Sequence, residues 1–157
     1  MDDILSNNYI ESVKGAQKTI FLASTTSIIL YALAVSADFK KVKVPLVNVE
    51  FEGVVGLSML FLIFVSLGIY LIIQLNQIKS NFDLIECNKI KKALINYPSI
   101  VCGKQLSKIF FICLPSLLLS IAMYEAFKGE ILLTSFIVIL LSVPYFLACS
   151  IVGAVKT

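Results

Sequence analysis

Four long stretches of the sequence are apolar and almost free of charge, and they limit what this chain can fold into. Each has about the 20 residues that a helix needs to cross the hydrocarbon core of a bilayer. They run over about residues 19–37, 54–74, 109–127 and 131–155, and the charged residue among them is Glu125, near the end of the third. A charge at the centre of a membrane helix costs about 2.5–3.5 kcal/mol. The pattern predicts an all-α integral membrane protein, with residues 1–157 forming one four-span domain.

The composition argues against the alternative of a water-soluble helical bundle. Apolar residues make up 59% of the chain and charged residues 15%, whereas soluble domains have roughly 45–50% and 25%. Buried helices of a soluble bundle also show a charged stripe every turn or two. The small residues at 35–37 resemble a signal-peptide cleavage site. However, a polar segment of 18 residues precedes the first apolar stretch, so we expect a retained helix.

The lysines predict the topology, because loops on the cytoplasmic side carry more basic residues. All 13 basic residues are lysine. Nine of them fall in the N-terminal segment, the segment 75–108 and the C-terminal tail, and four fall in the loops 38–53 and 128–130. We therefore expect a multi-pass protein of the bacterial inner (plasma) membrane with both termini and the segment 75–108 in the cytoplasm.

Two connecting segments have patterns of their own. Past residue 74, an apolar 3-4-3 spacing predicts a helical extension into the cytosol, and we call its residues the apolar seam: Leu75, Ile78, Phe82 and Ile85. Such spacing is typical of helices that pack side by side. The partner helices are either those of sister subunits, which makes this an oligomer seam, or the chain's own N-terminal helix. The external loop 38–53 is β-like, since apolar residues alternate along it. It either pairs with a neighbouring subunit's copy or lies extended on the helix ends.

The sequence contains nothing that resembles a catalytic or metal site. Without histidine it lacks the commonest general base and the commonest metal ligand. No phosphate-binding loop occurs, and no two cysteines have the C-x-x-C spacing of a zinc or redox site. We therefore expect no enzyme activity, no catalytic residues, no metal and no cofactor.

Two sets of residues are candidates for binding or conduction. The cytosolic segment carries a basic set: Lys89, Lys91, Lys92 and Lys104. It either reflects topology and attraction to anionic lipid, or docks an acidic protein, a nucleotide or nucleic acid. The spans carry a set of small and hydroxyl residues: Thr25, Thr26, Ser135, Ser142 and Cys149. The last three are spaced by seven, which predicts that they share one face of the fourth span. These either form ordinary helix-packing seams or line a pore.

The function that these patterns favour is a subunit of a homo-oligomeric membrane channel or pore-forming effector, with a tetramer as the expected assembly. A partner or ligand would gate it through the cytosolic segment. The alternatives are a membrane anchor or sensor for a cytosolic protein, and a small transporter or assembly factor. Four spans, a β-like external loop and a basic cytosolic segment resemble the small multi-span proteins that bacteria encode in phage-defence operons. The resemblance implies a membrane-permeabilising effector, or a sensor paired with a soluble protein.

Overall fold

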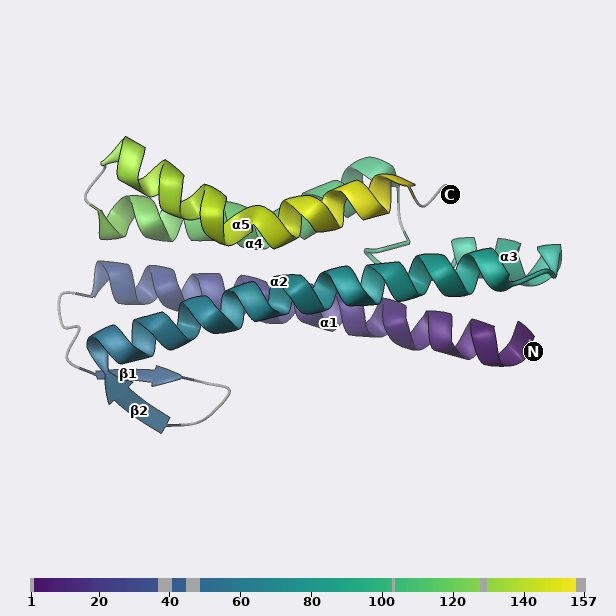
Figure 1. Ribbon diagram of the computed structural model, residues 1–157, viewed down its shortest axis with the longest axis horizontal. Helices are drawn as coiled ribbons and strands as arrows, with labels where there is room; N and C mark the ends of the chain where they lie inside the picture. The colour runs from purple at the N-terminus through teal and green to yellow at the C-terminus, as the bar shows by residue number, and fades with distance from the viewer. Residues whose placement is uncertain (1, 37–40, 45–48, 103, 128–129, 155–157) are drawn as a thin grey trace.

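The described part of the chain forms five helices and two short antiparallel strands (Figure 1). The computed structural model describes residues 2–36, 41–44, 49–102, 104–127 and 130–154. In chain order the elements are α1 (Asp2–Val35), β1 (Lys41–Val44), β2 (Val49–Glu52), α2 (Gly53–Leu84), α3 (Asn88–Ile95), α4 (Gln105–Ala126) and α5 (Ile131–Ala154).

The four long helices lie along one axis as a bundle. Helix α1 packs against α2 and α4, and α5 packs against α2 and α4. Helix α1 begins and α5 ends at the same end of the bundle, where α3 also lies, and we call it the α3 end (Figure 1). The strands β1 and β2, the end of α4 and the start of α5 lie at the opposite end, which we call the hairpin end. The four long helices thus run back and forth along the bundle, so α5 ends at the end where α1 begins.

The four long helices make this a multi-pass membrane protein. Helices α1, α2, α4 and α5 are long and apolar enough to cross a bilayer. Their outer surface is apolar as well, since Leu62 is 68% exposed, Phe136 68% and Leu132 89%. Side chains of this kind are stabilised by lipid rather than by water.

Helices α1, α2 and α4 are longer than the apolar stretches that predicted them. Helix α1 runs without a break through the polar N-terminal segment and the first span, and it ends at Val35. No proline interrupts residues 2–35, so the polar segment continues the same helix. Helix α2 likewise continues to Leu84, ten residues past the predicted end of the second span. The third span begins earlier than expected, at Gln105.

The segment between α1 and α2 contains the antiparallel strands β1 and β2. Lys41 is opposite Glu52 and Val44 is opposite Val49. Strand β2 leads directly into α2 at Gly53. The residues that join the two strands, among them Pro45, lie outside the described residues.

The centre of the bundle is closed by a contact between α2 and α5. The Tyr145 side chain is completely buried, and its ring lies 4.7 Å from that of Phe64. Its hydroxyl donates a hydrogen bond of 2.8 Å to the backbone carbonyl of Phe64. Gly68 allows this approach, because a Cβ atom there would lie 2.8 Å from the Pro144 Cβ and 2.9 Å from the Tyr145 ring. The contact therefore depends on a glycine in α2 and a tyrosine in α5.

A second buried hydrogen bond joins α1 to α4. The Ser27 hydroxyl donates to the Pro115 carbonyl at 2.9 Å and also lies 3.2 Å from the carbonyl of Ala23 in its own helix. A carbonyl oxygen has two lone pairs, so the Pro115 oxygen can accept this bond besides a helical one. Hydrogen bonds of this kind hold membrane helices together where the hydrophobic effect cannot.

At the α3 end, the first residues of α1 hold α3 in place. The Asp2 carboxylate accepts a hydrogen bond of 3.2 Å from the backbone N–H of Cys87, directly before α3. The rings of Tyr9 and Phe82 lie 6.0 Å apart. Lys91 of α3 places its Nζ 5.5 Å from the centre of the Phe82 ring, within reach of a cation–π contact.

Candidate functional site: a polar groove between α1 and α2

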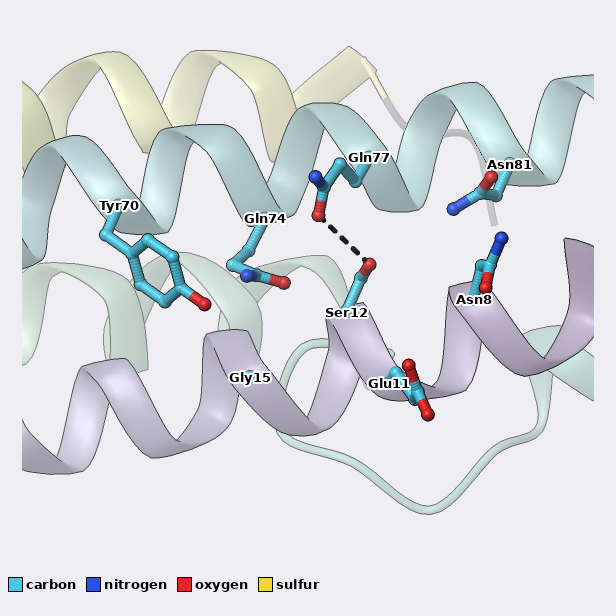
Figure 2. Close-up of a pocket in the computed structure, with 8 residues that line it drawn as sticks. All are labelled: Asn8, Glu11, Ser12, Gly15, Tyr70, Gln74, Gln77 and Asn81. Atoms are coloured by element: carbon cyan, nitrogen blue, oxygen red, sulfur yellow. Dashed lines mark hydrogen bonds between the residues drawn. The ribbon is translucent and has the colours of Figure 1, made fainter.

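A groove of about 500 Å³ lies between α1 and α2, toward the α3 end of the bundle (Figure 2). Its lining, which we call the polar groove, consists of Asn8, Glu11, Ser12, Gly15, Tyr70, Gln74, Gln77 and Asn81. Almost all of these side chains carry an amide, a hydroxyl or a carboxylate. Such a concentration of polar groups beside two membrane helices makes the groove the candidate functional site.

The helical repeat brings these residues together. The four groove residues of α2 are spaced by 4, 3 and 4, which keeps them on one face of the helix. They lie beside the apolar seam of the same helix, since Gln74, Gln77 and Asn81 each directly precede a seam residue. Helix α2 thus turns one apolar face to the core and one polar face to the groove.

The groove lies where the apolar parts of both helices end. The charge-free stretch of α1 begins at Thr19, and that of α2 ends at Ile78. Gly15 and Gln74 face each other across this border (Figure 2). At 1.5 Å per residue, the 20 residues from Gln74 back to Val54 span about 30 Å, the thickness of the hydrocarbon core. This length places Gln74, and with it the groove, near the border of the hydrocarbon core.

Close approach of the two helices positions the amides. Gly15 has no side chain, and the Gln74 Oε1 lies 2.9 Å from where a Cβ atom of residue 15 would be. The Ser12 hydroxyl donates to the Gln77 Oε1 at 3.4 Å. Ser12 and Gln74 are buried, at 7% and 8% exposure, while Glu11 is exposed. Amide and hydroxyl oxygens of this kind can replace the water molecules around a cation, and Glu11 adds a negative charge.

No group of three or more potential metal ligands occurs among the described residues, so the groove has no metal-ligand cluster beside it.

A second polar cluster lies near the α3 end, where the Tyr9 hydroxyl and the Cys102 thiol are 3.4 Å apart. With the buried Lys108 they line a void of about 20 Å³, room for about one water molecule. Burial raises the pKa of the Cys102 thiol, against smaller opposing effects of the Tyr9 hydrogen bond and the Lys108 charge. The thiol is therefore uncharged at neutral pH and a weak nucleophile.

The predicted basic set is partly exposed. Lys89, Lys92 and Lys104 are exposed to solvent, whereas Lys91 is half-buried against Phe82. Lys89 and Lys92 belong to α3, and Lys104 directly precedes α4. The three exposed amines remain available to a partner.

The predicted set of small and hydroxyl residues does not share one environment. Thr25 is exposed and Thr26 buried, and each hydroxyl donates to a backbone carbonyl of its own helix. Ser135 is exposed and Ser142 fully buried, although a spacing of seven was expected to place them on one face. Cys149 is half-buried, with its sulfur 3.3 Å from that of Cys113 in α4. The set therefore lines no common surface. The beginning of α5, which includes Ser135, is exposed, whereas the middle of α5 around Ser142 and Tyr145 packs into the core.

The apolar seam is occupied within one chain. Leu75, Ile78 and Ile85 are at most 3% exposed, and Phe82 packs against Tyr9 of α1. The partner is thus the chain's own N-terminal helix, which was one of the two alternatives. A single chain already covers these side chains, so they offer no exposed apolar surface to a sister subunit.

The polar groove itself was not predicted. The sequence indicated only the end of a membrane span at residue 74 and a polar segment over residues 1–18. The signal that could have revealed the groove is the 4-3-4 spacing of Tyr70, Gln74, Gln77 and Asn81. Comparisons of this chain with protein-family models, with curated proteins and with solved structures find no match. The functional assignment consequently depends on the residues and their geometry.

Proposed function

We propose that this chain is a subunit of a homo-oligomeric membrane channel in which the polar groove faces the axis of the assembly. The observation that carries the proposal is the groove itself. Seven polar side chains and one glycine line it between α1 and α2, and four of these residues are exposed: Asn8, Glu11, Tyr70 and Gln77. In a ring of subunits, a tetramer in the simplest case, the grooves would together form a hydrophilic mouth at the α3 end.

The packing of the single chain favours a path between subunits over a path within one. Phe64, Leu71, Leu119 and Tyr145 fill the middle of the bundle and are at most 1% exposed. Water and ions therefore have no open route through these side chains. A route along the outer faces of α1 and α2 needs no rearrangement of this core.

The same faces become apolar toward the hairpin end. Ile29 follows the groove residues along α1, and Leu67 and Ile63 follow them along α2. All three are half-buried, so part of each remains available for contact outside the chain. A narrow apolar passage beyond a polar mouth can open and close by wetting and drying, without a buried charge. Glu11 at the mouth favours cations over anions.

Gating would act through the α3 end. Helices α1 and α2 are continuous from that end through the membrane, and Asp2, Tyr9 and Phe82 connect both of them to α3. A partner or ligand that binds the exposed Lys89 and Lys92 could therefore move both groove helices together. With the α3 end in the cytoplasm of a bacterium, as the lysines predict, such a channel is suited to a membrane-permeabilising role in phage defence.

An ion-leak assay with the full-length chain in liposomes tests the proposal. We expect the wild-type protein to release potassium ions, and the double variant Gln74→Leu, Gln77→Leu to do so far more slowly. Loss of two amides leaves passing ions less well solvated by about 1–3 kcal/mol, which slows passage roughly tenfold or more. Gln105→Leu is the matched control, because Gln105 is an exposed amide on α4 outside the groove.

Equal leak rates for the groove variant and wild type would contradict the assignment of the groove to the pore. Liposomes that stay impermeable at either sign of membrane potential, although an inserted oligomer is present, would contradict the channel function itself.

The second candidate is a membrane anchor that docks a cytosolic partner, and the exposure of Lys89, Lys92 and Lys104 favours it. In that case the spans only hold the basic surface at the membrane. Charge reversal at Lys89 and Lys92 would then abolish binding of an acidic partner, while Gln74→Leu, Gln77→Leu would leave it unchanged.

A further inference from the structure

A second hollow lies on the outward face of α1. It has a volume of about 410 Å³, and we call it the basic hollow. Its lining consists of Lys14, Gln17, Lys18, Phe21, Leu22 and Thr25. The hollow lies opposite the buried face of α1, so it faces the surroundings of the bundle rather than its core.

The lining changes from basic to apolar along the helix. Lys14 and Lys18 are exposed and one turn apart, and Phe21, which is 55% exposed, follows one turn later. At the far end, the Thr25 hydroxyl donates to the backbone carbonyl of Phe21 at 2.9 Å. Because that hydroxyl already donates a hydrogen bond within the helix, this part of the hollow presents a mainly apolar surface to a ligand. The basic part points toward the α3 end and the apolar part toward the middle of the membrane.

This order matches the order of groups in a phospholipid that stands beside the helix. The charge-free stretch begins at Thr19, directly after Lys18, so both lysines lie at the level of the headgroup phosphates. Among the described residues, no carboxylate lies within ion-pair distance of Lys14 or Lys18, and Glu11 is the nearest acidic residue along the helix. Gln17 is oriented by Ser99, whose hydroxyl donates to the Gln17 Oε1 at 3.2 Å. That bond leaves the amide N–H groups of Gln17 as further donors.

We propose that the basic hollow is a binding site for an anionic phospholipid. The lipid phosphate lies between the amines of Lys14 and Lys18, and an acyl chain runs along Phe21 and Leu22. The position of the lysines at the hydrocarbon border and the apolar wall beyond them select a lipid over a soluble anion. The site does not depend on the channel function, because it lies on a different face of α1 from the polar groove.

Native mass spectrometry of the full-length protein, released from detergent micelles, tests the site. Phosphatidylglycerol and phosphatidylcholine are compared as added lipids, with inorganic phosphate as a soluble competitor. We expect phosphatidylglycerol to stay bound in preference to phosphatidylcholine. In the variant Lys14→Gln, Lys18→Gln, its affinity falls roughly fivefold for each lysine removed. The matched control is Lys89→Gln, Lys92→Gln, which removes the same charge from exposed positions on α3 and keeps the affinity of the wild type.

Two further variants distinguish loss of charge from misfolding and test the apolar wall. Lys14→Arg, Lys18→Arg keeps both charges and restores binding, which shows that the glutamine variant failed for lack of charge rather than through misfolding. Phe21→Ser weakens binding of the lipid, because the acyl wall is lost. Equal retention of phosphatidylglycerol by wild type and by Lys14→Gln, Lys18→Gln would overturn the proposal. Displacement of the lipid by inorganic phosphate would also overturn it, because the hollow would then be a site for soluble anions.

Discussion

Replacing Tyr145 by alanine is expected to lower the free energy of unfolding by about 3 kcal/mol or more. The tyrosine is 0% exposed, its ring stacks against Phe64, and its hydroxyl bonds the Phe64 carbonyl at 2.8 Å. Alanine would leave a cavity between α2 and α5 in the middle of the bundle. The cost arises mainly from lost packing contacts, because lipid around an unfolded span is as apolar as the core.

Unfolding of the purified chain in mixed micelles, followed by its helical circular dichroism as denaturing detergent is added, measures this change. Tyr145→Phe keeps the ring and removes the hydroxyl, so it is expected to cost about 1 kcal/mol, as interhelical hydrogen bonds in membranes do. Phe146→Ala is the matched control, since Phe146 is the next residue and is 51% exposed to the surroundings. Equal losses for Tyr145→Ala and Phe146→Ala would show that α5 does not pack on α2 through Tyr145.

The second large effect is expected at Gly68, where alanine lowers the free energy of unfolding by about 1–3 kcal/mol. The new Cβ would lie 2.8 Å from the Pro144 Cβ and 2.9 Å from the Tyr145 ring. The Pro144 ring is closed on the backbone of α5 and cannot rotate away from the new Cβ atom, so the two helices must move apart. The same detergent titration measures the cost.

Gly15→Ala is the control for Gly68→Ala, because both glycines lie inside a helix. A Cβ at residue 15 would meet the end of the Gln74 side chain, which can rotate away. The intrinsic preference of alanine for helix then offsets the contact, and we expect a change of about 0.5 kcal/mol or less. In the Tyr145→Ala background, Gly68→Ala should cost less than in the wild type, since one of the two clashes is gone. Equal costs for the two glycines would contradict the close contact of α2 with α5.

The membrane-spanning helices could be predicted from the sequence because lipid imposes a simple condition. A span must be long and free of charge, and the stretches 19–37, 54–74, 109–127 and 131–155 meet that condition on composition alone. Their ends were less accurate. Polar residues such as Asn8 and Gln77 end a hydrophobic stretch without ending a helix, so α1 and α2 extend well past the hydrocarbon border.

The arrangement of side chains inside the bundle could not be predicted. In a membrane span nearly every residue is apolar, so periodicity does not distinguish a lipid-facing side from a core-facing side. Ser135 and Ser142 illustrate this, because their spacing predicted one face but the structure exposes one and buries the other. The packing of Tyr145 on Gly68 joins residues 77 positions apart, and no local pattern marks it.

The polar faces of the candidate site could have been predicted from the sequence, but their pairing into a groove required knowledge of which helices are neighbours. The polar positions of α2 repeat with helical spacing, and those of α1 do so as well. The groove forms only because α1 and α2 run antiparallel and bring Gly15 opposite Gln74. The apolar seam shows the reverse case, since its pattern was clear while its partner, α1 rather than a sister subunit, was left open.

Sided labelling of two introduced cysteines tests most directly whether the chain crosses the membrane with the α3 end in the cytoplasm. Glu130→Cys and Lys89→Cys place exposed thiols at the hairpin end and the α3 end, each in a variant whose four native cysteines are replaced by serine. A membrane-impermeant maleimide added to intact spheroplasts is predicted to label Glu130→Cys at once and Lys89→Cys only after the membrane is permeabilised. Labelling of both positions in intact spheroplasts, or recovery of the protein in the soluble fraction, would contradict the four-span account.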